Sequence, residues 1–308
     1  GLFTSSPGST RNIYHNLNEL HAYGVGRTNP FGIINSIVGT LSWNLSAVFQ
    51  IQGAGCGFTS ACASSAHALG FAHDQIALGR QDRVLVTGAE DGDLFGILPF
   101  AGMRALSTAT DPDLASLPFD RRRNGFVGCG GAATLVLESA HAAAKRGAAV
   151  LAEFSGWGQT SDGYKPAAPL PDGSGLSRAM ELALKSAEFS RDSIHYLNAH
   201  ATGTLPGDLA ELRAIRRACG DDPTFPISST KSITGHGLSY AGILESALSI
   251  LALNDGFIPG TTNLEEPDPE AQGLNLPREN LIARGGKFLS NSSGFGGANV
   301  CLAFEIPS

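Results

Sequence analysis

Short apolar runs rich in β-branched residues alternate along the chain with longer segments in which apolar positions recur every three or four residues. Runs of the first kind predict buried strands, and segments of the second kind predict helices that pack on a sheet. The predicted strands cover residues 83–88, 132–138, 149–155, 196–199, 225–228, 287–290 and 300–305, and a further strand opens the chain at residues 1–6. The predicted helices cover residues 62–78, 139–146, 174–187, 206–218 and 239–254. Elements that alternate in this order are typical of parallel sheets covered by helices on both faces.

A weak internal repeat refines this α/β architecture. Residues 130–138 and residues 296–305 each place a glycine pair directly before an apolar strand. A duplicated α/β unit would leave such an echo, although a glycine pair before a strand also arises by chance in a chain with 39 glycines. No low-complexity linker separates two parts of the chain, and the Pro-rich stretches at 165–171 and 259–269 are predicted to be ordered surface loops.

The composition is that of an ordinary soluble enzyme. The chain has 308 residues, of which 42% are hydrophobic and 16% are charged, and no apolar run is long enough to cross a bilayer. This length allows a large core in one or two domains. The net charge of −7 argues against a protein made chiefly for binding nucleic acid. The first residues lack the basic leader and the apolar stretch of a secretory signal.

The five cysteines form an odd set without C-x-x-C spacing, and most of them sit in apolar surroundings. These features favour reduced thiols in the cytoplasm over a disulfide framework or a zinc site. Four of the five are expected to be small buried hydrophobic residues: Cys56, Cys129, Cys219 and Cys301.

The fifth cysteine, Cys62, has a different setting. A strand-like segment over residues 53–59 runs into small residues and then into helical periodicity, which places Cys62 in the first turn of a buried helix. The partial positive charge at a helix start lowers the pKa of a thiol, and the free backbone N–H groups there stabilise a developing anion. Cys62 is therefore predicted to be nucleophilic near neutral pH.

Two downstream segments of unusual composition carry histidines. Residues 198–208 contain His200 among Ala, Thr and Gly, and residues 229–237 contain Lys231 and His236. Both segments follow strand-like runs, where binding loops commonly lie. The other histidines are expected on the surface or on helix faces.

In their order along the chain, these three segments resemble the elongating β-ketoacyl-acyl carrier protein synthases, the condensing enzymes of the thiolase-like superfamily. The likeness extends to Ala-Leu-Ser-Thr at residues 105–108, to Phe-Asp and Asn-Gly-Phe-Val within 119–127, and to residues 291–299. It implies an α/β fold of two related βαβαβ-type halves in α-β-α-β-α layers. The halves would cover residues 1–147, with the nucleophile, and residues 148–308, with both histidines. The first half would be incomplete, since family members carry roughly a hundred further residues ahead of Gly1.

The resemblance also implies a reaction, the decarboxylative Claisen condensation of fatty-acid or polyketide chain elongation. Cys62 would hold the acyl group, and malonyl-acyl carrier protein would lose CO2 and attack that group to give 3-oxoacyl-acyl carrier protein. His200 and His236 would donate hydrogen bonds to the enolate oxygen. The backbone N–H groups of Cys62 and Phe295 would form the oxyanion hole for the second step.

Supporting roles follow from the same resemblance. Lys231 would assist the histidines through a charge network with Glu245, because a buried ammonium is costly without an acidic partner. Asp208 and Glu211 would be structural acids. Thr202 and Thr204 would supply hydroxyls that hold the pantetheine arm or the malonyl group, and Phe100 would form a wall of the acyl tunnel.

One position departs from the family pattern, because Ser293 stands where relatives usually carry Phe. Whether the glycine-rich loop gates the acyl pocket is therefore left open. The same departure retains the alternative that the protein is a non-catalytic partner, such as a chain-length factor or a scaffold subunit. A thiolase would use a second cysteine as its base, and Cys301 lacks the expected glycine setting. The presence of Cys62, Lys231 and both histidines favours the synthase.

No metal and no organic cofactor is expected, because loss of CO2 drives the condensation while imidazoles and backbone donors handle the charge. The expected partners are acyl carrier protein and a second copy of the chain, in a homodimer formed by sheet continuation across a two-fold axis. Neither nucleic acid nor membrane insertion is expected. Arg121–Arg123 is a candidate docking patch for the carrier, although a charged loop between elements is the commoner reading.

Overall fold

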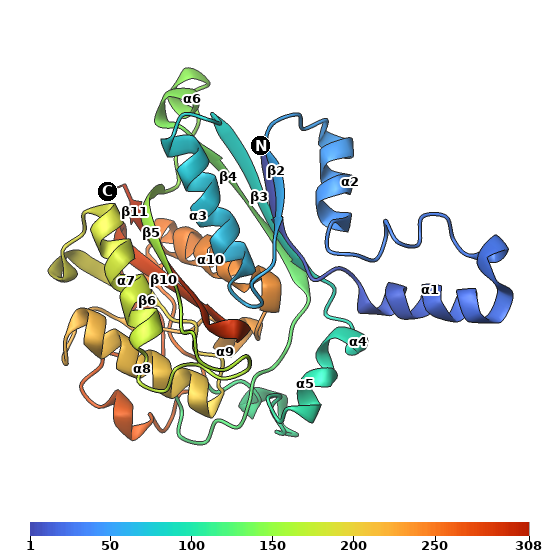
Figure 1. The fold of residues 1–308 in the computed structure, drawn as a ribbon. Coiled ribbons are helices and arrows are strands. Elements are labelled where there is room, and N and C mark those ends of the chain that lie inside the picture. Colours follow the sequence, from blue (N-terminus) through green and yellow to red (C-terminus); the bar gives the residue numbers. More distant parts are fainter. Residues whose placement is uncertain (308) are drawn as a thin grey trace.

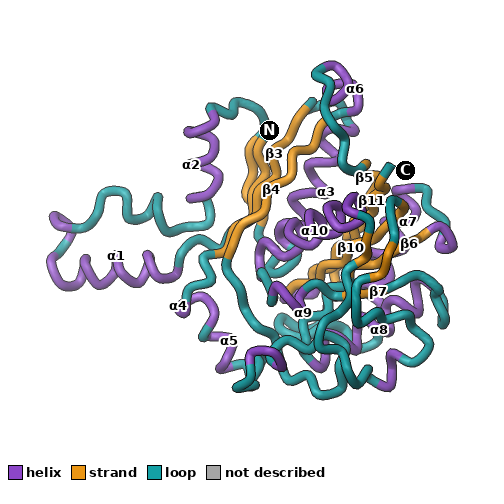
Figure 2. Tube along the Cα trace, turned by 180° about the vertical axis from the view of Figure 1, so that it is seen from behind, coloured by secondary structure: helices purple, strands orange, loops and turns teal. Residues whose placement is uncertain are grey.

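The strands form two mixed sheets that repeat one arrangement (Figures 1 and 2). The structure, a computed structural model, describes residues 1–307. The first sheet contains β1 (Leu2–Ser5), β2 (Gly55–Phe58), β3 (Arg83–Glu90) and β4 (Gly131–Glu138). The second contains β5 (Glu153–Ser161), β6 (Ile194–Asn198), β7 (Ile227–Ser228), β10 (Gly286–Gly294) and β11 (Ala298–Ile306). A separate hairpin joins β8 (Phe257–Ile258) to β9 (Leu281–Ile282).

The strand orders are β2-β1-β3-β4 in the first sheet and β7-β6-β10-β11-β5 in the second. In each sheet three neighbouring strands run parallel and the fourth is antiparallel to the third. β4 and β11, the strands that follow the two glycine pairs, therefore occupy equivalent places. The internal repeat predicted from those glycine pairs is thus present in the topology, and β5 is the additional strand of the second sheet.

Two helices fill the space between the sheets, α3 (Ser64–Ala77) and α10 (Ala241–Asp255). They cross closely because small residues meet there: a Cβ atom at Gly242 would lie 2.8 Å from the Cβ of Ala66. The backbone N–H of Ile243 donates to the Ser65 hydroxyl at 3.1 Å. Outside the second sheet lie α7 (Ser174–Ala187) and α8 (Leu205–Cys219), so helices and sheets form alternating layers (Figure 1).

Most predicted elements lie within a few residues of the observed ones, but one strand was misplaced. The predicted strand at 149–155 begins only at Glu153 and continues to Ser161 as β5. Val150 and Leu151, which suggested the earlier start, are 57% and 51% exposed, whereas Trp157 is buried. The apolar run therefore lies at the surface, and the strand uses the Gly-Trp-Gly segment that follows it.

The sequence prediction also missed two helices, α1 (Thr10–Tyr23) and α2 (Thr40–Phe49). Neither contains a buried residue, and α1 and the loop after it project away from the sheets (Figures 1 and 2). Large apolar side chains on these helices are 37% to 71% exposed: Ile13, Tyr14, Leu17, Leu20, Tyr23, Trp43, Val48 and Phe49. An apolar surface of this extent is typical of an interface with another protein chain.

The remaining short helices are α4 (Leu94–Ile97), α5 (Pro99–Gly102), α6 (Ala140–Lys145) and α9 (Lys231–Thr234). Alternate residues of β4 are exposed, among them Val136 at 59%, and no strand pairs with its outer edge within residues 1–307. Among the helices of residues 1–307, none combines the length and the apolar character that a membrane crossing requires.

Candidate active site

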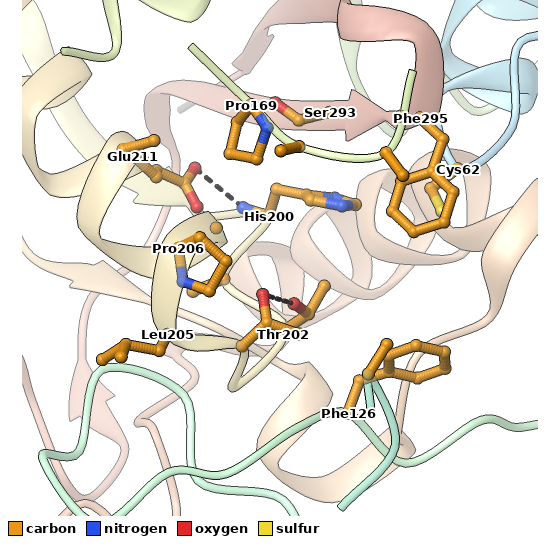
Figure 3. Close-up of a pocket in the computed structure, with 18 of the residues that line it drawn as sticks. Cys62, Phe126, Pro169, His200, Thr202, Leu205, Pro206, Glu211, Ser293 and Phe295 are labelled. Atoms are coloured by element: carbon orange, nitrogen blue, oxygen red, sulfur yellow. Dashed lines mark hydrogen bonds between the residues drawn. The ribbon is translucent and has the colours of Figure 1, made fainter. Parts of the chain in front are cut away.

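One cavity of about 410 Å³ brings together side chains from both halves of the chain (Figure 3). Cys62, His200 and His236 all line it, although they are far apart in the sequence. In the close-up, the Phe295 ring stands beside the Cys62 sulfur and the His200 imidazole points toward both. Phe100, Thr202, Thr204, Glu211 and Ser293 also line the cavity, so most of the site residues expected from the sequence meet in one place.

Cys62 lies two residues before α3 begins, and not within its first turn as the sequence predicted. The expected lowering of its pKa is wrong as well. Burial raises the pKa of the Cys62 thiol to about 12, and the positive charge of Lys231 offsets only part of this effect. The thiol is therefore protonated at neutral pH in the free protein, and its activation needs a base.

Alkylation of Cys62 by iodoacetamide is accordingly expected to accelerate about tenfold per pH unit from pH 7 to pH 10, because the thiolate fraction grows tenfold per unit below the pKa. Peptide mapping by mass spectrometry distinguishes Cys62 from Cys56, which is exposed and not buried as the sequence predicted. A rate that levels off above pH 8 would instead indicate a thiol whose pKa is lowered by the helix start.

The two imidazoles stand against each other, with ring centroids 5.2 Å apart and planes at 85°. Burial is the largest cause that holds the pKa of both His200 and His236 well below its usual range, and the charge of Lys231 adds to it. Both rings are therefore neutral near pH 7, and each carries one N–H. Among residues 1–307 neither Nδ1 atom has a hydrogen-bond partner.

Two buried acids fix the segment that carries His200. Glu211 accepts the His200 backbone N–H at 2.9 Å and the Asn291 side-chain amide at 3.0 Å. Asp208 accepts the backbone N–H of Thr202 at 3.0 Å and that of Gly203 at 3.1 Å. Both carboxyls lie in α8, so this helix sets the position of the histidine segment through backbone hydrogen bonds.

Lys231 is fully buried and does not line the cavity, and its charge acts on both histidines. It forms an ion pair with Glu245 of α10, as the resemblance implied. Burial raises the pKa of Glu245 to about 7, against the opposing effect of the Lys231 charge. The segment with His236 follows α9 directly, and the backbone N–H of His236 donates to the Val127 carbonyl at 2.6 Å.

The glycine-rich loop after β10 closes the cavity next to Cys62. A Cβ atom at Gly294 would lie only 2.5 Å from the Ser60 carbonyl oxygen and 3.1 Å from the Cys62 nitrogen, so a larger residue does not fit there. The Gly296 N–H donates to the Pro166 carbonyl at 2.6 Å. These contacts hold the loop of Phe295 close to the Cys62 backbone.

Ser293, the departure from the family pattern, donates its hydroxyl to the Asn299 side-chain oxygen at 2.9 Å. Asn299 in turn donates to Asp162 at 2.7 Å, and all three residues line the cavity. The sequence prediction missed Asp162 and Asn299 as site residues. An Asp-Gly pair in a turn and an Asn at a strand start are common surface features, so neither gave a signal on its own.

The remaining wall is built from hydroxyl and aromatic groups. The Thr202 and Thr204 hydroxyls lie 3.0 Å apart and share a hydrogen bond. The Phe100 ring, in α5, packs against Phe126 at 5.3 Å and Phe295 at 6.0 Å between centroids. The cavity wall thus contains both hydroxyl and aromatic groups.

The arginines of Arg121–Arg123 are engaged within the structure. Arg121 is paired with Glu266, and Arg122 binds Asp120 at 2.8 Å. The side chain of Arg123 is fully buried and binds Asp268 at 2.8 Å. These contacts favour the reading of this stretch as a charged structural loop over a docking patch. Within residues 1–307, no group of three or more His, Cys, Asp or Glu side chains is arranged to hold a metal ion.

Comparison with known proteins agrees with this architecture. Two family models match, "Beta-ketoacyl synthase, N-terminal domain" over residues 3–143 and "Beta-ketoacyl synthase, C-terminal domain" over residues 151–265. The 3-oxoacyl-acyl-carrier-protein synthase 1 of Buchnera aphidicola is 41% identical over 276 residues, which cover 89% of this chain and 67% of the relative.

Two solved structures show the same fold. A beta-ketoacyl synthase from Burkholderia phymatum superposes with a TM-score of 0.94 at 35% identity, covering 100% of this chain and 75% of that one. A type II PKS acyl-carrier protein in complex with its ketosynthase bound to the hexaketide gives a TM-score of 0.94 at 26% identity, covering 100% of this chain and 78% of that one. The chain has the thiolase-like α/β fold and belongs to the beta-ketoacyl synthase family.

Proposed function

We propose that the protein catalyses decarboxylative Claisen condensation between an acyl group held on Cys62 and a malonyl group on acyl carrier protein. The observation that carries this proposal is the convergence of Cys62, His200 and His236 on one cavity. A nucleophile, two neutral imidazoles and backbone donors are the groups that acyl transfer and enolate stabilisation need.

In the first step, the Cys62 sulfur attacks the carbonyl carbon of an acyl thioester and the carrier thiol departs. Because the thiol is protonated at rest, a neutral imidazole of the pair takes its proton and returns it to the departing sulfur. The tetrahedral oxyanion accepts hydrogen bonds from the backbone N–H groups of Cys62 and Phe295. The contacts of Gly294 with the Cys62 turn support this pairing of donors.

In the second step, the bond between the malonyl carboxylate and its neighbouring carbon breaks and CO2 leaves. The electron pair forms an enolate, whose oxygen accepts hydrogen bonds from His200 and His236. The enolate carbon then attacks the acyl carbonyl, the new carbon–carbon bond forms, and Cys62 leaves as the thiolate. Two neutral rings suit this role, because each offers an N–H to an oxygen whose charge develops only during the reaction.

The other residues of the site take supporting roles in this proposal. Lys231 and Glu245 stabilise the histidine side of the cavity by their buried charges, and Asp208 and Glu211 position the His200 segment. Thr202 and Thr204 bind the pantetheine arm or the malonyl group, and Phe100 lines the acyl pocket.

The alternative functions fit the site less well. A thiolase would need a second cysteine at the cavity, but Cys301 is buried in the core cluster of the second sheet and does not line the cavity. A chain-length factor or scaffold subunit needs neither the nucleophile nor the paired imidazoles. The presence of all three around one cavity favours the catalytic function.

We infer two partners. Acyl carrier protein is proposed as the carrier of both substrates, as in the ketosynthase complex with which this chain shares its fold. A second copy is supported by the exposed apolar side chains of α1 and α2 and by the outer position of β2, whose first three residues are exposed.

Sedimentation should then give twice the mass of the chain, and a single-chain mass at micromolar concentrations would refute the dimer.

The proposed function is tested by incubating the protein with an acyl-acyl carrier protein and with malonyl-acyl carrier protein. Mass spectrometry should find one acyl adduct, on Cys62, and CO2 should appear in step with the 3-oxoacyl product. CO2 release without any adduct or product would instead identify a non-condensing relative of the synthases.

A further inference from the structure

The turn that carries Cys62, residues 60–64, has an unfavourable backbone conformation. Ala61 has a φ of 49°, in the left-handed region that residues with a Cβ atom rarely adopt. Such a conformation persists only where the surrounding structure holds it, and conformations of this kind cluster at functional sites. The groups that hold Ala61 therefore also determine where the next residue, Cys62, is placed.

Two serines brace the turn from both sides. The Ser64 hydroxyl accepts the Ser60 backbone N–H at 2.8 Å and donates to the Ala61 carbonyl at 2.6 Å. The Ala63 N–H donates to the Ser60 carbonyl at 3.1 Å. The Ser60 hydroxyl reaches out of the turn and shares a hydrogen bond of 2.7 Å with Nδ1 of His67. Ser60 is thus the point at which the turn is attached to the body of α3.

His67 is a fixed anchor for this attachment. Its ring stands edge-on to Trp157, with 6.3 Å between centroids, and stacks on Phe71 at 6.4 Å. Burial lowers the pKa of His67, which keeps the ring neutral and able to share a hydrogen bond with a hydroxyl. Since His67 and Ser60 are absent from the cavity lining, neither is placed to touch a substrate.

Ser60 also meets the loop that supplies the second backbone donor. Its carbonyl oxygen lies against Gly294, where an added Cβ atom would come within 2.5 Å, and the Cys62 nitrogen lies beside the same glycine. A displacement of Ser60 would therefore move the amide of Cys62 relative to that of Phe295.

We propose that Ser60 and His67 are positioning residues, whose hydrogen bond holds the strained turn so that the Cys62 and Phe295 amides face one carbonyl oxygen. This inference rests on the proposed acyl transfer to Cys62. The role is indirect, because the pair acts through the backbone of residues 60–62 and against Gly294. It predicts that losing the hydrogen bond harms steps that form an oxyanion more than steps that do not.

The test compares two reactions of the same sulfur in Ser60→Ala and His67→Phe, of which the second keeps an aromatic ring against Trp157. Each variant is expected to slow acyl transfer to Cys62 by about tenfold or more, because small displacements of preorganised donors are costly. Alkylation by iodoacetamide, a displacement without an oxyanion, should change by less than about threefold. The double variant should be no slower than the slower single variant, because both changes remove one shared contact.

Two further variants serve as controls. Ser60→Thr keeps the hydroxyl and should restore most of the acyl-transfer rate. His141→Phe alters an exposed histidine of α6 and should match the unmodified protein.

Acyl-transfer rates within about twofold of the unmodified protein in both single variants would overturn the inference, as would equal losses in both reactions, which indicate a merely structural role. If His67→Phe does not fold, Ser60→Ala decides alone. Absence of acyl transfer in the unmodified protein would overturn the proposed function itself, and this inference with it.

Discussion

Cys62→Ala is expected to abolish condensation while malonyl decarboxylation continues. Without the sulfur no acyl-enzyme can form, whereas His200 and His236, which are proposed to stabilise the enolate, remain in the cavity. Loss of a covalent nucleophile typically lowers turnover by about a thousandfold or more. The measurement follows labelled CO2 and the 3-oxoacyl product in the same reaction, so that the two activities are separated.

Two other variants sharpen this experiment. Cys219→Ala removes a cysteine that lies outside the cavity and should leave both activities intact. His200→Ala should still accept an acyl group on Cys62 but lose most of the CO2 release. Condensation that survives in Cys62→Ala would show that the nucleophile has been assigned to the wrong residue.

Lys231→Ala is expected to lower the free energy of unfolding by about 3 to 5 kcal/mol, because it leaves the Glu245 carboxylate buried without its partner. A carboxyl whose pKa is higher in the folded than in the unfolded chain lowers the stability of the fold as the pH rises. The reason is that the unfolded chain ionises at a lower pH than the folded one. The pKa of Glu245 is already raised to about 7, and loss of the lysine raises it further. The destabilisation measured by urea unfolding should therefore be larger at pH 8 than at pH 5.

The control for this experiment replaces both members of the pair. Lys231→Met combined with Glu245→Leu removes both charges and fills similar space, so it should recover much of the stability that Lys231→Ala loses. Its condensation activity should be low, as in Lys231→Ala, because the positive charge that acts on both histidines is gone. Equal stability of all three proteins at both pH values would contradict a buried ion pair.

The elements that could be predicted from the sequence are those whose regularly spaced apolar residues are buried against other parts of the chain. The helix predicted at 174–187 has these bounds in the structure, and its apolar side chains Leu176, Met180 and Leu184 are buried at helical spacing. α1 has a comparable spacing at Ile13, Leu17 and Leu20, but its many polar residues concealed it. Its apolar side chains are exposed and not packed into a core, so the expected alternation of strand and helix did not indicate this helix.

The site shows a similar division. The residues that motifs indicated do meet in one cavity: Cys62 before α3, His200 after β6 and His236 after α9. The pKa of Cys62 could not be predicted from its place near a helix start, since burial outweighs that effect. Contacts such as Ser60 with His67 span a strained turn, which sequence patterns do not reveal.

The facing sides of the two sheets share one interior, because α3 and α10 lie between them and present apolar side chains to both. One cluster joins Phe3 and Val86 of the first sheet to Phe288 of the second through Leu69 and Ile243 of these helices. Unfolding of either half would expose the apolar side chains that the other half buries. The two halves should therefore unfold in one thermal transition.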